Sequence, residues 1–470
     1  MKSRLVKNLS ANATQLIVNQ VFGFGIFYVL SIGLDKYNFG QINLVLAILL
    51  AVFNILSFGI DQLIIKKVAA GIEVSSILSI YISHVLLTGF AFYGILFVGY
   101  RFFPSANYTY SLLLLLGIGK LMIYFSTPFK QVANGLERFK LLAYMSIGSN
   151  IARCAGLIAL FIFHSLTLTN VVIVFINGDL IELLCCLLLF KKSIKTTLRV
   201  KWNWPAYSTL LRESLPQTGV VLITSALARF DWIFIGFMVS AVSLAEYSFA
   251  YKIFEIATLP LLAIAPILIP RFTKLFQQTD FRIDALKILV RVEMIVAALV
   301  ALVLNICWSP VIDGITSGKY GSINVKTIFI LSLCMPFLYI NNFLWTMYFA
   351  QGRLKAILIS FIITLIVNVG FDIILIPIFK NEGAAFAFLL ACVVQSVFYF
   401  KKNNVAGLTH LWLPLSLCTI CALISGFAAK MLFTNYCLAL PVSVVFYIIL
   451  LFASAQLKLS DRRSITALFN

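Results

Sequence analysis

The stretch ITSALARFDWIFIGF, residues 223–237, has the composition of a lipid-buried helix but carries Arg229 and Asp231 at its centre. A charged side chain at mid-bilayer costs at least about 2.5–3.5 kcal/mol unless it faces a partner, a bundle interior or a water-filled cavity. The two residues are two positions apart, so on a helix they point in different directions and do not form a local pair. Such charges are therefore candidates for function.

Further ionisable residues fall well within apolar segments. The full set is Lys120, Arg153, Asp179, Glu182, Arg229, Asp231, Lys252, Glu255, Arg291, Glu293, Asp372 and Lys430. Arg291 and Lys430 lie within about two turns of a predicted membrane face and can snorkel to it. Arg153 and Arg229 lie about 18–21 Å from the cytoplasmic ends of their helices, too deep to snorkel. A guanidinium group matches phosphate oxygens bidentately, so a central cleft containing both arginines is suited to an anion.

Structural pairing is the alternative for these charges. A buried salt bridge to Asp179, Glu182 or Asp372 would account for the arginines without any substrate. Asp179 and Glu182 share a helical face, and unless a cation lies nearby one of them should bind a proton. Lys252 and Glu255 are also three apart and can neutralise each other. Cations and carboxylates are equal in number within the set, so the argument for an anion rests on depth.

The elements that carry these residues are membrane spans. The chain of 470 residues is 61% hydrophobic and only 11% charged, which is too apolar for a soluble protein of this length. Apolar runs of about 20 residues recur along it, each long enough to cross a bilayer as a helix. We predict about fourteen spans, at 12–34, 41–65, 76–99, 110–133, 141–163, 168–190, 215–238, 245–270, 286–308, 326–350, 355–379, 383–400, 412–433 and 438–457.

The formal charge of +19 does not indicate nucleic-acid binding, because the basic residues gather at alternate ends of the predicted spans. Placing the N-terminus inside puts most lysines and arginines in cytoplasmic segments, as the positive-inside rule expects. Both termini are then cytoplasmic. The longest cytoplasmic connector follows the sixth span, and weak internal similarity across it favours two six-helix lobes. The predicted divisions are an N-terminal lobe at 1–190, a connector at 191–214, a C-terminal lobe at 215–400 and two further helices with a tail at 401–470.

Other chemistries find little support in the sequence. No cysteine or histidine spacing matches a metal site, and a buried polar role is the favoured interpretation of His84 in the third span. No phosphate-binding glycine loop is present, so ATP-driven transport by this chain is not expected. We predict a protein that is not an enzyme and that uses no cofactor or metal.

Four stretches resemble the polysaccharide transporter family, the Wzx-type flippases of lipid-linked oligosaccharides. This family belongs to a superfamily that also contains multidrug exporters and lipid II flippases. The stretches are FGQINLVLAILLAVFNILSFGIDQLIIKKVA, ANGLERFK, RFDWIFIGFMVSAVSLAEYSFAYKI and VNVGFDIILIPIFKNEGAAFA. In the last one, Lys380-Asn381-Glu382 stands where the family commonly has an aromatic-glycine stretch before Gly-Ala-Ala, so the outer loop differs. The resemblance covers essentially the whole chain.

The resemblance implies an all-α integral membrane protein of about fourteen transmembrane helices. Two six-helix lobes would form a pseudo-two-fold V-shaped arrangement, followed by two C-terminal helices. The implied substrate is an oligosaccharide on undecaprenyl pyrophosphate, moved from the cytoplasmic to the periplasmic leaflet by alternating access coupled to a proton or sodium gradient. By position, the implied anion contacts are Arg153 and Arg229, supported by Lys120 and Lys252. Candidates for ion coupling or for holding the arginines are Asp179, Glu182, Asp231 and Asp372.

The resemblance also implies a cellular setting, the bacterial inner membrane. The expected partners are the lipid-linked oligosaccharide, the lipid bilayer and the polymerase and chain-length machinery of surface polysaccharides such as O-antigen and lipopolysaccharide, with no nucleic acid. Two alternatives stay open. A multidrug/cation antiporter of the same superfamily would need an apolar or acidic cavity, and an integral-membrane glycan polymerase or ligase would need positioned acid and base groups in an outer loop.

Overall fold

The structure, a computed structural model, describes most of the chain as helix. The described residues are 19–102, 107–194, 203–261, 268, 272, 283–402 and 410–458, and they contain no β-strand. Among them, eleven helices are long and apolar enough to cross a membrane. The predicted all-α membrane class is confirmed.

The predicted spans correspond closely to these helices. The first and eighth appear as a helix over Asn19–Gly33 and as α9 (Ala241–Ala257), both shorter than a full span, with the rest of each prediction falling largely outside the described residues. The eleventh and twelfth lie in one element, α13 (Leu354–Lys402), which is interrupted at Lys380. The second is divided into α2 (Lys36–Leu56) and α3 (Ile60–Ala69).

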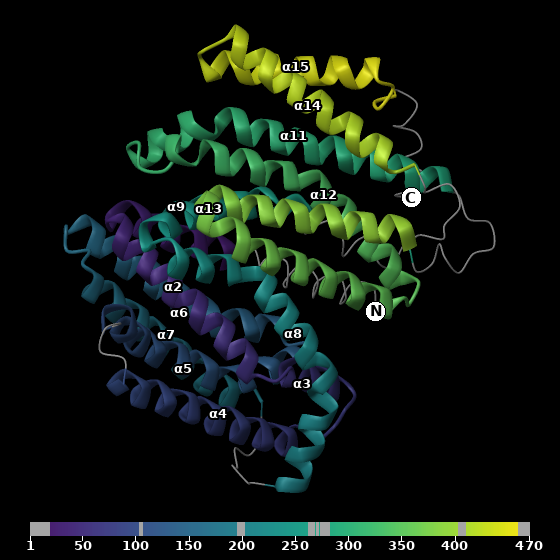
Figure 1. The fold of residues 1–470 in the computed structure, drawn as a ribbon. Coiled ribbons are helices and arrows are strands. Elements are labelled where there is room, and N and C mark those ends of the chain that lie inside the picture. Colours follow the sequence, from purple (N-terminus) through teal and green to yellow (C-terminus); the bar gives the residue numbers. More distant parts are fainter. Residues whose placement is uncertain are drawn as a thin grey trace. The chain divides into compact units, whose positions relative to one another are not determined.

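The chain divides into two compact units, residues 1–236 and 237–470. In the first unit, α5 packs against α2, α3, α4 and α7, and α6 packs against α7 (Figure 1). The remaining helices of this unit are α4 (Val74–Phe102), α5 (Asn107–Gly135), α6 (Phe139–Ile162), α7 (Leu168–Ser193) and α8 (Trp204–Met238). The predicted connector, 191–214, precedes the division between the units, and part of it lies outside the described residues.

The break between α2 and α3 has a local cause. Phe58 and Gly59 adopt left-handed backbone angles, with φ of 48° and 65°, which end one helix and start the next. The carbonyl group of Leu56 that the break releases accepts hydrogen bonds from His84 Nε2 at 2.9 Å and from the Tyr124 hydroxyl at 3.0 Å. The Phe58 carbonyl accepts from Thr218 of α8 at 2.7 Å. His84 therefore has a structural role at this break.

In the second unit, α12 (Val325–Ala350) lies between α11 (Ile283–Thr316) and α13. On its other side α11 packs against α14 (Trp412–Leu432) and α15 (Tyr436–Ala453) (Figure 1). The core of this unit is built from apolar side chains of α11, α12, α14 and α15, including the fully buried Met294, Phe343 and Cys418. The cysteine is core filler, as its apolar surroundings lead one to expect.

The long element α13 is a hairpin of two antiparallel helices. Lys380, at φ 52° and ψ −124°, is its non-helical apex. Residues on either side of the apex meet across the hairpin, since Ser360 donates to the Tyr399 hydroxyl at 2.8 Å and Arg353 to the Lys402 carbonyl at 3.0 Å. Next to the apex, a Cβ atom at Gly383 would lie 2.3 Å from the carbonyl oxygen of Leu375. Only glycine permits the two helices to start this close together.

Candidate functional site: a buried ionic cluster

Three helices of the first unit bring charged side chains together. Arg153 of α6 places one terminal nitrogen 2.5 Å from Asp179 Oδ1 and 2.8 Å from Glu182 Oε2, both on α7. From α5, Lys120 Nζ lies 3.1 Å from Asp179 Oδ2, and Lys130 forms an ion pair with Glu182 Oε1. We call these five residues the ionic cluster. It contains three cations and two carboxylates, so its formal charge is one positive.

The cluster has a buried centre and a more open edge. Arg153, Asp179 and Glu182 are each less than one-tenth exposed. The side chains of Lys120 and Lys130 are 25% and 18% exposed. Since the uncompensated charge is positive and the lysines are the accessible members, the edge of the cluster is a place where an anion would be attracted.

Polar neighbours orient the central arginine. Ser149 donates to Glu182 Oε2 at 2.7 Å, and Arg153 Nη1 donates to Asn150 Oδ1 at 3.0 Å. Arg153 follows Ser149 by four residues and Asn150 by three, so both polar residues lie on the side of α6 that carries Arg153. The remaining donor of the guanidinium group, Nε, has no hydrogen-bond partner in the described part of the chain.

Two glycines allow the helices to approach closely enough for these contacts. The buried face of α7 runs through Phe175, Gly178, Asp179 and Glu182, so the acidic pair lies on an otherwise packed face. A Cβ atom at Gly178 would lie 2.2 Å from Cγ of Arg153. A Cβ atom at Gly119 of α5 would lie 2.5 Å from Asp179 Oδ2. In membrane proteins generally, small residues at helix contacts allow the backbones of the two helices to approach closely.

We expect Gly178→Ala to displace Arg153 and to destabilise the protein by about 1–3 kcal/mol, the usual cost of overpacking. Unfolding of the purified protein in mixed micelles, followed by tryptophan fluorescence, measures this. The matched control is Gly148→Ala on α6, where the nearest atom to the added methyl group is Cys185 Sγ at 3.9 Å. Equal stability of the two variants would contradict the close approach at Gly178.

The structure gives the other predicted site residues separate surroundings. Arg229 stacks on the Trp232 ring at 4.4 Å and donates to the Ala228 carbonyl at 2.8 Å. Asp231 is buried and accepts a hydrogen bond from the Trp232 amide at 2.8 Å. Both lie outside the ionic cluster. Their assignment to anion binding and to ion coupling stays a prediction.

In the second unit, Lys252 and Glu255 form an ion pair of 2.8 Å on α9. The three-residue spacing in the sequence had allowed for this pair. Asp372 is fully buried in α13 and accepts from Asn368 Nδ2 at 2.5 Å. For Arg153, the structure shows the salt bridges that were the alternative to anion binding.

Sequence reasoning missed two members of these sites. Lys130 was not among the charged residues that the sequence placed within spans, but α5 continues to Gly135 and Lys130 forms an ion pair with Glu182. An acidic pair on α7 facing a helix with two lysines was the available signal. Glu293 of α11 received no role, yet it is 3% exposed and its carboxylate has no hydrogen-bond partner among the described residues.

Three solved structures show the fold that this chain shares. The structure of the lipid II flippase MurJ in an inward closed conformation matches with a TM-score of 0.75, at 15% identity, over 93% of this chain and 97% of that one. An inward-facing multidrug resistance MATE family transporter of the MOP superfamily matches with a TM-score of 0.65, at 13% identity, over 84% and 100%. A MOP superfamily transporter from Pyrococcus furiosus, described as having a binding pocket of reversed polarity, matches at 0.57 and 13%, over 84% and 94%.

The chain is therefore a multi-pass membrane protein with the MurJ and MATE transporter fold. Residues 5–276 match the family model of the polysaccharide biosynthesis proteins, and the chain belongs to that family. No protein of curated function matches its sequence. The family resemblance noted from the sequence is confirmed.

Proposed function

We propose that this protein is a flippase for oligosaccharides linked to undecaprenyl pyrophosphate. It moves the repeat unit from the cytoplasmic to the periplasmic leaflet of the bacterial inner membrane, where polymerase and chain-length proteins assemble a surface polysaccharide such as O-antigen. Membership of the polysaccharide biosynthesis family and the transporter fold support this proposal.

The observation that carries the proposal is the ionic cluster. Its formal charge of one positive and its partly exposed Lys120 and Lys130 suit a pyrophosphate group. A cation antiporter would place the opposite charge excess at such a site. In this proposal Lys120 and Arg153 contact the anion, and the roles of Arg229 in anion contact and of Lys252 in its support stay predictions made from their depth along the helices.

Ion coupling has a simple electrostatic basis in the same cluster. A proton taken up by Asp179 or Glu182 would raise the formal charge from one positive to two positive and would free a cation for the pyrophosphate. Release of the proton would restore the salt bridges and expel the anion. Asp231 and Asp372 are proposed as further coupling sites because they are buried carboxylates.

The test is a strain that lacks the gene, complemented with wild type, Lys120→Ala, Lys120→Arg or the control Lys192→Ala at the exposed end of α7. We expect loss of surface polysaccharide and accumulation of lipid-linked oligosaccharide in the deletion strain. Wild type and Lys192→Ala should restore the surface polymer fully and Lys120→Arg substantially, while Lys120→Ala should leave it at least tenfold lower.

Two outcomes distinguish a failure of the flippase proposal from a failure of the proposed anion site. Unchanged surface polysaccharide in the deletion strain would overturn the flippase proposal, and a gain in drug sensitivity would then favour the antiporter. Full rescue by Lys120→Ala, with the deletion strain still defective, would overturn only the assignment of the anion site.

A further inference from the structure

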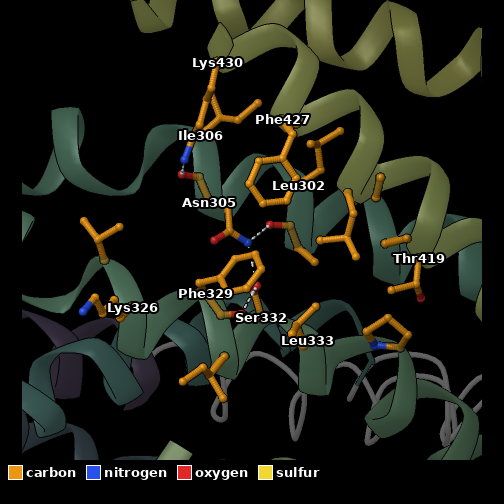
Figure 2. A pocket seen from close by; sticks show the side chains of 18 of the residues that line it. Leu302, Asn305, Ile306, Lys326, Phe329, Ser332, Leu333, Thr419, Phe427 and Lys430 are labelled. Carbon is orange, nitrogen blue, oxygen red and sulfur yellow. Dashed lines mark hydrogen bonds between the residues drawn. The ribbon is translucent and has the colours of Figure 1, made fainter. Parts of the chain in front are cut away.

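The second unit contains an apolar pocket of about 600 Å³ between α11, α12 and α14 (Figure 2). It arises because α14 packs along α11, with Gly426 against Leu302, but makes few contacts with α12. Phe329 of α12 and Phe427 of α14 meet edge to face across the space at 6.3 Å. Phe427 is 59% exposed, so the pocket is open at this side of the helices.

The polar side chains of Asn305 and Thr419 inside the pocket already form hydrogen bonds within the protein, so an occupant need not supply them. Asn305 donates to Ser332 Oγ at 2.5 Å and to the Ala301 carbonyl at 2.8 Å (Figure 2). Thr419 donates to the carbonyl of Leu415 in its own helix. The helices that form the pocket are membrane spans, and a hydrocarbon chain is the occupant that an open apolar space of this kind takes within a bilayer.

Two lysines mark one end of the pocket. Lys430 of α14 and Lys326 of α12 both line it, and neither forms a salt bridge within the described chain (Figure 2). Lys430 Nζ donates to the carbonyl of Asn305 at 3.1 Å. Glu382 also lines the pocket, so two cations and one carboxylate leave a formal charge of one positive.

A second cavity of about 290 Å³ adjoins the pocket at Lys430. The two cavities share Asn305, Ile306, Val325 and Lys430. Three residues that line the smaller cavity, Ser309, Thr434 and Tyr436, carry hydroxyl groups, and most of the others are apolar. An apolar space, a cationic junction and a smaller space with three hydroxyl groups thus follow one another.

We infer that this pair of cavities binds one anionic diacyl phospholipid. An acyl chain lies between Phe329, Phe427 and Leu302, the phosphate lies at Lys430 and Lys326, and a polyol headgroup enters the smaller cavity. The single negative charge of phosphatidylglycerol matches the single positive charge of the rim. This site is separate from the ionic cluster and does not depend on the proposed function.

Native mass spectrometry of the full chain from vesicles of phosphatidylcholine with one-quarter phosphatidylglycerol tests the inference. Wild type should retain one phosphatidylglycerol at least tenfold in preference to phosphatidylcholine. The Lys326→Gln/Lys430→Gln double variant should lose that preference, and Lys355→Gln/Lys401→Gln, exposed lysines elsewhere in the unit, should keep it. Ala301→Phe should lower retention of the bound lipid at least fivefold by filling the apolar part while leaving both lysines.

Three results would overturn the inference. The first is equal retention of the two phospholipids by wild type. The second is unchanged retention of phosphatidylglycerol by both the double variant and Ala301→Phe. The third is displacement of phosphatidylglycerol by an equimolar amount of undecaprenyl phosphate, which would assign the pocket to a polyprenyl lipid.

Discussion

An Arg153→Ala variant is expected to be about 3 kcal/mol less stable than wild type and to leave cells without surface polysaccharide. Removal of the arginine leaves Asp179 and Glu182 buried on one face of α7 with only the two lysines of α5 to balance them. Each carboxylate keeps one lysine partner, so the cost is that of losing the two hydrogen bonds between charged groups that Arg153 makes to Asp179 and Glu182, at about 1.5 kcal/mol or more each. Unfolding in mixed micelles and complementation of the deletion strain measure the two effects. The control is Lys192→Ala.

A charge-balanced double variant separates stability from transport. Arg153→Met with Glu182→Gln removes one charge of each sign, so we expect much of the lost stability to return. If Arg153 contacts the pyrophosphate, surface polysaccharide should be absent in this variant and present in the single variant Glu182→Gln, which controls for the coupling role of Glu182. Recovery of both properties would show that Arg153 serves only to hold α6 and α7 together.

The second large effect is expected at the apex of the α13 hairpin, where Gly383→Ala should destabilise the protein by about 3 kcal/mol. The added methyl group would meet the carbonyl oxygen of Leu375 at 2.3 Å, and a backbone atom cannot rotate away as a side chain can. The two helices would have to separate, and overpacking of this kind costs about 1–3 kcal/mol or more.

The same hairpin contains its own control. A Cβ atom at Gly370 would meet nothing within 4 Å, so Gly370→Ala removes a helix-interior glycine without a clash. We expect it to be neutral or to stabilise the protein by up to about 1 kcal/mol. Thermal unfolding in detergent should therefore give a lower midpoint than wild type for Gly383→Ala. The midpoint of Gly370→Ala should equal or exceed that of wild type. Equal midpoints would contradict the hairpin geometry.

Much of the fold could be predicted because hydrophobic length is a local property. The spans at 355–379 and 383–400 were separable in the sequence because Lys380, Asn381 and Glu382 interrupt the apolar run, and the structure places the apex at Lys380. The break at Gly59 was not predictable in the same way. The apolar pattern continues through it, and the groups that satisfy its carbonyls come from α4, α5 and α8.

The site was only partly predictable for a related reason. Depth along a helix identified Arg153, and spacing identified the shared face of Asp179 and Glu182. Which cations lie next to them depends on how α5, α6 and α7 pack, and no spacing within one helix encodes that. Lys130 shows the limit, since it lies near the end of α5 and yet forms an ion pair with Glu182 of α7.

The ionic cluster also bears on how the protein is made. On scales of insertion by the translocon, each charge at the centre of a helix costs about 2.5–3.5 kcal/mol, and α7 carries two acidic residues. The helices that neutralise them, α5 and α6, precede α7 in the chain and leave the ribosome first. The order of synthesis thus places the cations in the membrane before the acids arrive, and α7 enters beside helices that lower the cost of its insertion.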